Sequence, residues 1–175
     1  MVPFIWVVGR DHSSDEVADE VAAVAGESGQ VVKGWAPQLA ILGHIAVGTF
    51  VTHCGRWAVT EAVALDRLLQ TWPLFGEQFY NEKFVVEVAR TGESMGAKRG
   101  VVLSREKVAE RVRWAHGTGA EAVRKRAWDI VLVVRREVVK GGSSYASVDC
   151  MIEDIRQRRE KRNRGNREEN LNWSS

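Results

Sequence analysis

The chain has 175 residues, of which 45% are hydrophobic and 27% are charged, and its formal net charge is +2. This composition is typical of a globular domain of ordinary size and excludes a disordered or fibrous chain. The two cysteines, Cys54 and Cys150, stand far apart in no metal-binding spacing, so we expect no disulfide framework and a reducing, cytoplasmic setting. The longest apolar run, at 130–134, is much shorter than the roughly 18 residues that a membrane helix needs, so no membrane association is expected.

Up to residue 103, short apolar runs alternate with longer segments of helical period. The runs that predict buried strands lie at 4–8, 30–35, 47–53, 68–72 and 100–103. The segments that predict helices lie at 15–25, 37–44, 57–65 and 77–90. Alternation of this kind predicts an α/β fold of Rossmann type, in which a parallel sheet carries helices on both faces.

After residue 103 the pattern predicts helices only. Ser104 is a candidate N-cap for the first of them, and Gly141-Gly142 ends the second. From Arg156 onward, six arginines and one lysine face three glutamates, which gives this end a net charge of +4 and leaves −2 for the rest. Because this basic end has no nucleic-acid-binding motif, we expect residues 158–175 to be a disordered tail and expect no nucleic-acid partner.

The stretch THCGRWAVTEA at 52–62 places a histidine and a cysteine at the end of a predicted strand. Cys54-Gly55 reads as a turn, and a helix is expected to start near Trp57. His53 would then lie beside the free amides of a helix N-terminus, which is an anion-binding arrangement. A Cys54 nucleophile with His53 as its base is disfavoured because neighbouring residues on a strand point to opposite faces. A zinc site is disfavoured because His44 and Cys150 do not supply further ligands at a suitable spacing.

Residues 35–78 closely resemble the signature box of plant family-1 UDP-sugar glycosyltransferases, in the runs WAPQLAIL, VGTFVTHCG and WPLFGEQFYNEK. The runs PFIWVV, EVARTGESMGAK and GGSSYASVDCMIEDI extend the resemblance to about residue 157. The resemblance implies that residues 1–157 are the UDP-sugar-binding C-terminal domain of a GT-B glycosyltransferase. In that family a second Rossmann-like domain faces this one across a cleft.

The resemblance also implies the residues that bind the nucleoside. Trp35 would stack on uracil, a contact that contributes about 1–3 kcal/mol. The backbone of Ala36 and the side chain of Gln38 would lie near the base and ribose, and Glu61 would accept both ribose hydroxyls.

For the rest of the donor, His53 would hydrogen-bond the pyrophosphate. Glu77 and Gln78 would hold sugar hydroxyls, and a glutamine at this position implies UDP-glucose as the donor. The resemblance implies no cofactor and no metal, and it places no catalytic residue in this chain. A small-molecule hydroxyl compound would be the acceptor.

Two stretches depart from the family. Arg56-Trp57-Ala58 stands where the family has Trp-Asn-Ser. The loss of the serine hydroxyl removes a phosphate hydrogen bond of about 1.5–3 kcal/mol. Arg56 could compensate with its positive charge, whereas the bulky Trp57 could block the pyrophosphate. Asp66-Arg67-Leu68 replaces a Gly-Val-Pro turn, and Asp66 is a residue that tolerates the left-handed conformation that such a turn requires.

The chain opens at PFIWVV, whereas the family's domain has a strand before it that is central in the sheet order 3-2-1-4-5-6. Without this strand, its neighbours would expose unpaired edges that a protein partner could fill. The family's catalytic histidine lies in the other domain, and none of the four histidines here, His12, His44, His53 and His116, matches it.

We therefore expect a truncated, donor-binding half of a UDP-glycosyltransferase that transfers no sugar alone. The alternative is a non-catalytic interaction protein, or pseudoenzyme, derived from such an enzyme. A fragment or incomplete gene model is a third interpretation.

Overall fold

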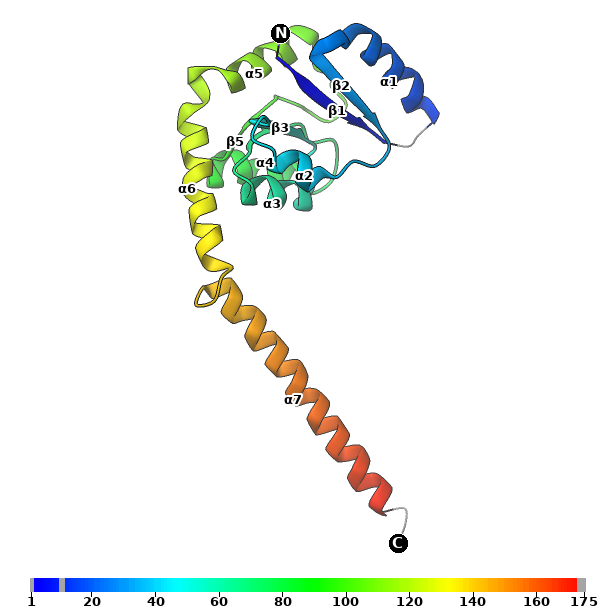
Figure 1. Ribbon diagram of the computed structural model, residues 1–175, viewed down its shortest axis with the longest axis vertical. Helices are drawn as coiled ribbons and strands as arrows, with labels where there is room; N and C mark the ends of the chain where they lie inside the picture. The colour runs from blue at the N-terminus through cyan, green and yellow to red at the C-terminus, as the bar shows by residue number, and fades with distance from the viewer. Residues whose placement is uncertain (1, 10–11, 173–175) are drawn as a thin grey trace. The chain divides into compact units, whose positions relative to one another are not determined.

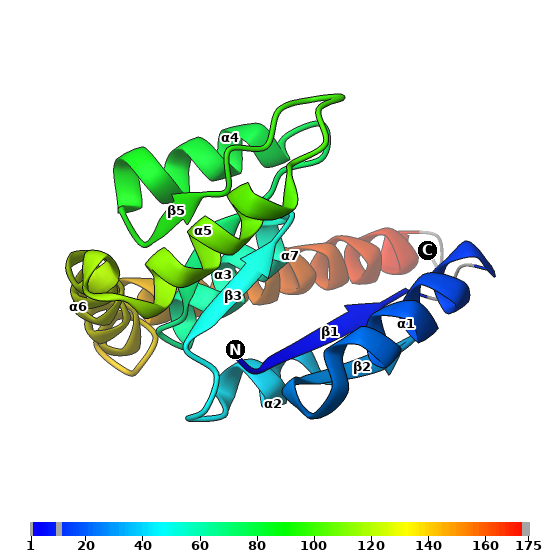
Figure 2. The same ribbon diagram turned by 90° about the horizontal axis from the view of Figure 1, so that it is seen from above.

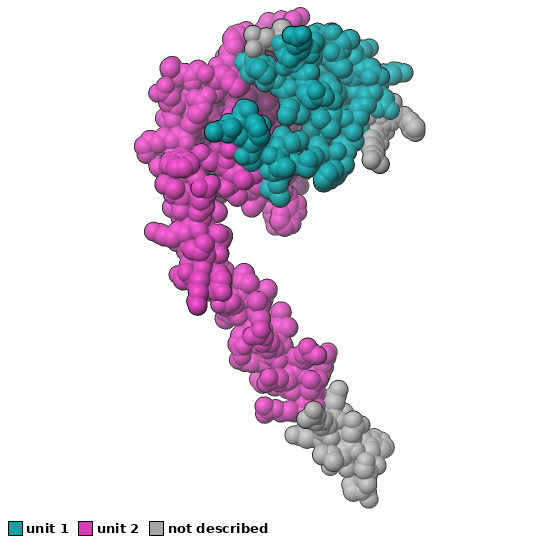
Figure 3. All heavy atoms as spheres, in the orientation of Figure 1, with its two compact units in different colours: residues 1–47 teal, residues 48–175 magenta. Residues whose placement is uncertain are grey.

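The computed structural model describes residues 2–9 and 12–172. The chain divides into two compact units, Met1–Val47 and Gly48–Ser175, each of which is described by itself (Figure 3). The boundary between the units falls inside the signature box at 35–78, which therefore contributes residues to both.

The first unit contains a two-stranded parallel sheet. Strand β1 (Phe4–Val8) pairs with β2 (Gly29–Lys33), and helix α1 (His12–Ala25) followed by the short turn η1 (Gly26–Ser28) connects them. Helix α1 packs against β2 (Figure 2), and its Asp19 carboxylate lies 2.8 Å from the Lys33 ammonium. The short helix α2 (Gln38–Gly43) completes the unit.

The second unit contains a three-stranded parallel sheet in the order β3 (Thr49–Thr52), β4 (Leu68–Thr71) and β5 (Gly92–Ser94). All four residues of the middle strand β4 are buried. Because side chains alternate along a strand, Leu69 packs on one face and Leu68 on the other. The two faces of this sheet therefore have separate apolar clusters.

Helices cover both faces of this sheet. The Leu69 cluster includes residues of α3 (Arg56–Ala64) and of η2 (Phe84–Ala89), a π-helix that continues α4 (Gln78–Lys83). The Leu68 cluster includes residues of α5 (Arg105–His116) and η3 (Thr118–Ala120). Parallel strands covered on both faces are the α/β arrangement that the sequence predicts.

Two longer helices follow, α6 (Glu121–Glu137) and α7 (Ser143–Asn172) (Figure 1). Ser104 is the N-cap of α5, and its hydroxyl accepts from the Lys107 amide at 3.3 Å. Residues 158–172, where composition favours a disordered tail, continue α7 as helix, and 173–175 lie outside the described residues. No helix among the described residues is both long and apolar enough to span a membrane.

One predicted strand is wrong. Residues 100–103 form only an isolated bridge between Val101 and Lys98, because the chain turns at Gly100, whose φ is +73°. The third strand of the sheet is instead β5, whose three residues, Gly-Glu-Ser, pair in parallel with Leu69–Thr71. Its sequence has no β-branched or aromatic residue, so only the pairing with β4 defines it as a strand.

The open strand edges expected from the sequence are present. Among the described residues, β1 pairs with β2 alone and β3 with β4 alone, so each strand has one unpaired edge. The side chains of Phe4, Ile5, Trp6 and Val7 in β1 are 36–48% exposed. An apolar strand with one free edge is a surface on which another extended segment can pair.

Candidate functional site

The turn that carries His53 joins β3 to α3 and has an unusual backbone. Cys54 is left-handed, with φ +66°, a conformation that residues other than glycine rarely adopt. Its amide donates to the Thr52 hydroxyl at 3.2 Å, and its carbonyl accepts from the Asn81 side-chain amide at 2.8 Å. The turn is therefore fixed on both sides of the strained residue.

The imidazole of His53 lies against Gly55, immediately before α3. A Cβ on Gly55, the N-cap of α3, would be 2.7 Å from His53 Nε2, so the imidazole in this rotamer lies directly against the N-cap. No side chain caps the helix, and the first amides of a helix have no intrahelical partner. An exposed imidazole beside these amides forms a corner of hydrogen-bond donors that suits an anion.

The three residues that depart from the family begin α3 at this corner. Arg56 and Trp57 are exposed, and the Trp57 side chain is 78% accessible to solvent. Ala58 is buried. Arg56 thus adds a cation at a helix end that already favours anions.

The thiol of Cys54 is not set up as a nucleophile. The side chain is fully buried among Val59, Ala62 and Leu69. Burial first, and the nearby Glu82 carboxylate second, raise the pKa of this thiol to about 12. The group is therefore a neutral thiol at neutral pH, which suits packing and not attack on a substrate. The part of the chain that the structure describes contains no cluster of three or more His, Cys, Asp or Glu side chains suited to a metal ion.

The residues expected at the sugar lie at the start of α4, in the same unit as His53. Glu77 is exposed at the N-cap. Gln78 is only 3% exposed, and its Oε1 accepts from the amides of Leu74 and Phe75 at 2.8 and 3.1 Å. Gln78 therefore holds the loop that precedes it, a role that the sequence did not predict. Because Oε1 is occupied, Nε2 is the side-chain atom that could reach a sugar hydroxyl.

The residues expected at the nucleoside divide between the units. Glu61 is half-buried on α3, whereas Trp35 and Ala36 lie between β2 and α2 in the first unit and Gln38 begins α2. The Trp35 side chain is 79% exposed, which leaves a broad aromatic face available for stacking. The Ala36 carbonyl accepts from the Gln38 amide at 2.8 Å, as α2 begins. Within the second unit the structure brings together His53 with Arg56–Ala58 and Glu77 with Gln78.

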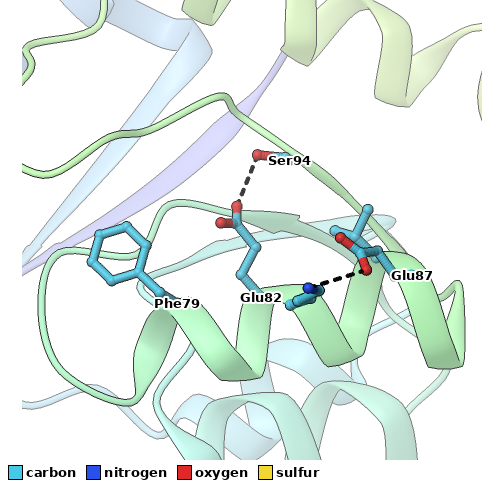
Figure 4. Close-up of a pocket in the computed structure, with 6 residues that line it drawn as sticks. Phe79, Glu82, Glu87 and Ser94 are labelled. Carbon is cyan, nitrogen blue, oxygen red and sulfur yellow. Dashed lines mark hydrogen bonds and ion pairs between the residues drawn. The ribbon is translucent and has the colours of Figure 1, made fainter.

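Helix α4 also carries polar contacts that sequence reasoning missed. The Glu82 carboxylate accepts from the Thr71 hydroxyl at 2.7 Å. It also accepts from the Ser94 hydroxyl at 2.8 Å (Figure 4). It faces a shallow hollow of about 340 Å³, which is lined by Phe79, Glu82, Lys83, Val86, Glu87 and Ser94 and by none of the expected site residues. One helix face carries Gln78, Asn81 and Glu82, because Asn81 and Glu82 follow Gln78 by three and four residues. This spacing in EQFYNEK is the sequence signal from which a shared polar face of α4 could have been predicted.

Comparison with known proteins identifies the relatives of this chain. Residues 18–100 match the model of the family described as UDP-glucoronosyl and UDP-glucosyl transferase. UDP-glycosyltransferase 73B1 of Arabidopsis thaliana is 41% identical over 161 residues, which cover 87% of this chain and 33% of that protein. Nuatigenin 3-beta-glucosyltransferase of Solanum aculeatissimum is 36% identical over 167 residues, covering 89% of this chain and 34% of that protein.

Solved structures of the same kind match the fold. Glycyrrhiza uralensis UGT73P12, complexed with glycyrrhetinic acid 3-O-monoglucuronide, aligns with a TM-score of 0.84 and 32% identity, covering 97% of this chain and 38% of that one. Medicago truncatula UGT71G1, complexed with UDP-glucose, aligns with a TM-score of 0.74 and 27% identity, covering 87% of this chain and 33% of that one. This chain belongs to the plant UDP-glycosyltransferases and spans about one third of the length of the relatives it matches.

Proposed function

We propose that this chain is the donor-binding part of a UDP-glycosyltransferase, which transfers a hexosyl group from a UDP-sugar to the hydroxyl of a small molecule. The observation that carries the proposal is the corner at the start of α3, where the His53 imidazole lies over Gly55 beside uncapped helix amides. A diphosphate leaving group gains negative charge as the glycosidic bond breaks. Donors fixed at that point stabilise the transition state more than the ground state.

The remaining residues take roles along the donor. The exposed indole of Trp35 stacks on uracil, the backbone of Ala36 and the side chain of Gln38 lie near the base and ribose, and Glu61 accepts the ribose hydroxyls. Arg56 supplies a cation at the diphosphate, so that imidazole, guanidinium and helix amides neutralise its charge without a metal ion. Buried Ala58 stands where the resemblance implies a phosphate-binding serine, and Arg56 compensates for the missing hydroxyl.

We propose UDP-glucose as the sugar donor, with Glu77 and the Nε2 atom of Gln78 at the sugar hydroxyls. Two similar proteins support this choice, since the Solanum aculeatissimum relative is a glucosyltransferase and the Medicago truncatula structure is a complex with UDP-glucose. We also propose a reducing, cytoplasmic setting, which the unpaired Cys54 and Cys150 support. Transfer itself is assigned to the complete two-domain enzyme, and this chain alone is expected to be inactive.

The experiment is a calorimetric titration of the purified chain with UDP, UDP-glucose, UDP-galactose and GDP. UDP and UDP-glucose should bind and GDP should bind at least about tenfold more weakly, since Trp35 and its neighbours recognise uracil. Glu77→Ala should remove the preference for UDP-glucose over UDP-galactose and leave UDP affinity within about twofold, because Glu77 is exposed and reaches only the sugar. Equal affinity for GDP and UDP would contradict the proposal.

A second function is favoured by the open edges of β1 and β3. The chain would then be a non-catalytic interaction protein that binds a partner supplying an extended segment to pair with the exposed strand Phe4–Val8. A stable complex with a protein partner, together with no detectable UDP affinity, would favour this function over donor binding.

A further inference from the structure

The diphosphate corner, formed by the His53 imidazole and the first amides of α3, depends for its geometry on one strained residue. Cys54 stands between His53, whose imidazole forms one side of the corner, and Gly55, which begins the free amides on the other side. Its φ of +66° is unfavourable for a residue with a Cβ. A relaxation of Cys54 to an ordinary conformation would swing the imidazole and the start of α3 apart, so the contacts that hold Cys54 also set the geometry of the corner.

Four contacts hold Cys54 in this conformation. Its thiol donates to the Thr52 carbonyl at 3.6 Å. Its side chain is fully buried in the cluster with Val59 and Leu69. Its amide donates to the hydroxyl of Thr52, which is 5% exposed. Its carbonyl accepts from Asn81 Nδ2 at 2.8 Å, across 27 positions of sequence.

Asn81 is itself fixed by the helix that carries it. Helix α4 is anchored at its first turn, where Gln78 accepts from the Leu74 and Phe75 amides. It is also anchored beside Asn81, where Glu82 accepts from the Thr71 hydroxyl of β4. A donor on a helix tied at two further points has little freedom, so its hydrogen bond transmits a fixed position to the Cys54 carbonyl.

We infer that Asn81 is a positioning residue of the donor site, which acts through the Cys54 carbonyl to hold His53 and the N-terminus of α3 in the arrangement that binds a diphosphate. The inference rests on the proposed function for its ligand. Asn81 touches no part of the donor in this scheme. Helix α4 presents Glu77 to the sugar and, through Asn81, also fixes the residues that bind the diphosphate. One helix therefore positions both the sugar-binding and the diphosphate-binding groups relative to each other.

The test compares variants of the full chain by UDP calorimetry and by thermal unfolding. Asn81→Asp keeps the shape of the side chain but cannot donate when ionised, so UDP affinity should fall at least tenfold. Thr52→Val, which removes the acceptor for the Cys54 amide, should have the same effect, whereas Thr52→Ser, which keeps the hydroxyl, should bind UDP within about twofold of the wild type. Wild-type UDP affinity in Asn81→Asp would overturn the inference.

A matched control separates positioning from stability. Ser94→Ala also removes a side-chain hydrogen bond to α4, but it lies at Glu82, which keeps its bond from Thr71. This variant should lower the unfolding midpoint by an amount comparable with Asn81→Asp and leave UDP affinity within about twofold. Equal losses of UDP affinity in Ser94→Ala and Asn81→Asp would reduce Asn81 to a stabilising residue. If Asn81→Asp does not fold, the Thr52→Val and Thr52→Ser pair decides.

Hydrogen exchange in the ligand-free chain keeps this inference separate from the proposed function. The Cys54 amide, which donates to Thr52, should exchange at least about tenfold faster in Asn81→Asp than in the wild type, while amides in β4 should be unchanged. If the wild type fails to bind UDP but this exchange difference appears, the proposed ligand is wrong and Asn81 still holds the turn. Unchanged exchange at Cys54 would overturn the positioning role itself.

Discussion

Helices α3 and α4 follow neighbouring strands of one sheet, yet their first residues differ in exposure to solvent. At the start of α3, His53, Arg56 and Trp57 are exposed and no side chain caps the helix. At the start of α4, Gln78 is buried and its oxygen is occupied by two amides of the preceding loop. The first start is open at these three side chains, whereas the second exposes Glu77 but uses the Gln78 oxygen to hold its own loop. Membership of one signature box therefore does not give its residues one kind of role.

The largest effect that we expect is a difference in alkylation rate between Cys54 and Cys150. Alkylation of Cys54 by iodoacetamide at pH 7.5 should be at least about a hundredfold slower than that of exposed Cys150, because burial raises the Cys54 pKa to about 12 and excludes the reagent. Mass spectrometry of a time course measures both rates in one sample. Comparable rates would show that the turn before α3 opens readily, in conflict with the fixed geometry described for it.

Substitution of Gln78 should mainly affect stability. Gln78→Leu leaves the Leu74 and Phe75 amides without their acceptor, which should reduce the free energy of unfolding by about 2 kcal/mol. The neighbouring Glu77→Gln, at an exposed position, should change it by less than about 0.5 kcal/mol. Urea unfolding of the two variants makes the comparison. Equal effects would mean that Gln78 does not hold the loop.

A substitution in the turn after α3 should increase the stability of the fold. Asp66 is left-handed, with φ +58°, as the loss of a glycine-containing turn suggested, and Asp66→Gly should add about 1 kcal/mol of stability at pH 7. Burial raises the pKa of Asp66, with Arg67 and Arg135 opposing the shift, so the folded state holds its proton more tightly than the unfolded state. The stability that protonation contributes is fully present below the unfolded pKa of 3.8 and is lost as pH rises through the folded value.

The gain from Asp66→Gly should therefore be larger at pH 7 than at pH 3.5. Chemical unfolding at the two pH values measures this difference. A gain that is the same at both pH values would assign the whole effect to the backbone, and a loss of stability would contradict the account of this turn.

Local sequence signals predicted the open helix start but not the closed one. The strand that ends at Thr52, the turn at Cys54-Gly55 and the following helix are encoded in consecutive residues, so the anion corner could be expected. The bonds of Gln78 to the loop before it, and that of Asn81 to Cys54, depend on tertiary structure, and no pattern in EQFYNEK distinguishes a ligand-facing amide from a loop-holding one.

The same limit applies to the fold. Strands β1 to β4 have apolar or β-branched residues and were predicted, whereas β5 is Gly-Glu-Ser and exists because β4 pairs with it. Apolar content also did not predict burial. Residues of β4, which has a neighbour on both edges, are all buried, but Trp6 in β1, whose apolar run predicted a buried strand, is 36% exposed beside an open edge. Burial follows from the number of neighbours, which one strand's sequence does not contain.

The central claim, that the open start of α3 binds the diphosphate of a UDP-sugar, is tested most directly by calorimetric titration of the full chain and of its His53→Ala variant with UDP. We predict saturable binding to the wild type and at least tenfold weaker binding to His53→Ala, about 1.4 kcal/mol, with an unchanged unfolding midpoint. His116→Ala, at the last residue of α5, is the matched control and should bind as the wild type does. Equal UDP affinity in the wild type and His53→Ala, or no binding by a folded wild-type chain, would contradict the account.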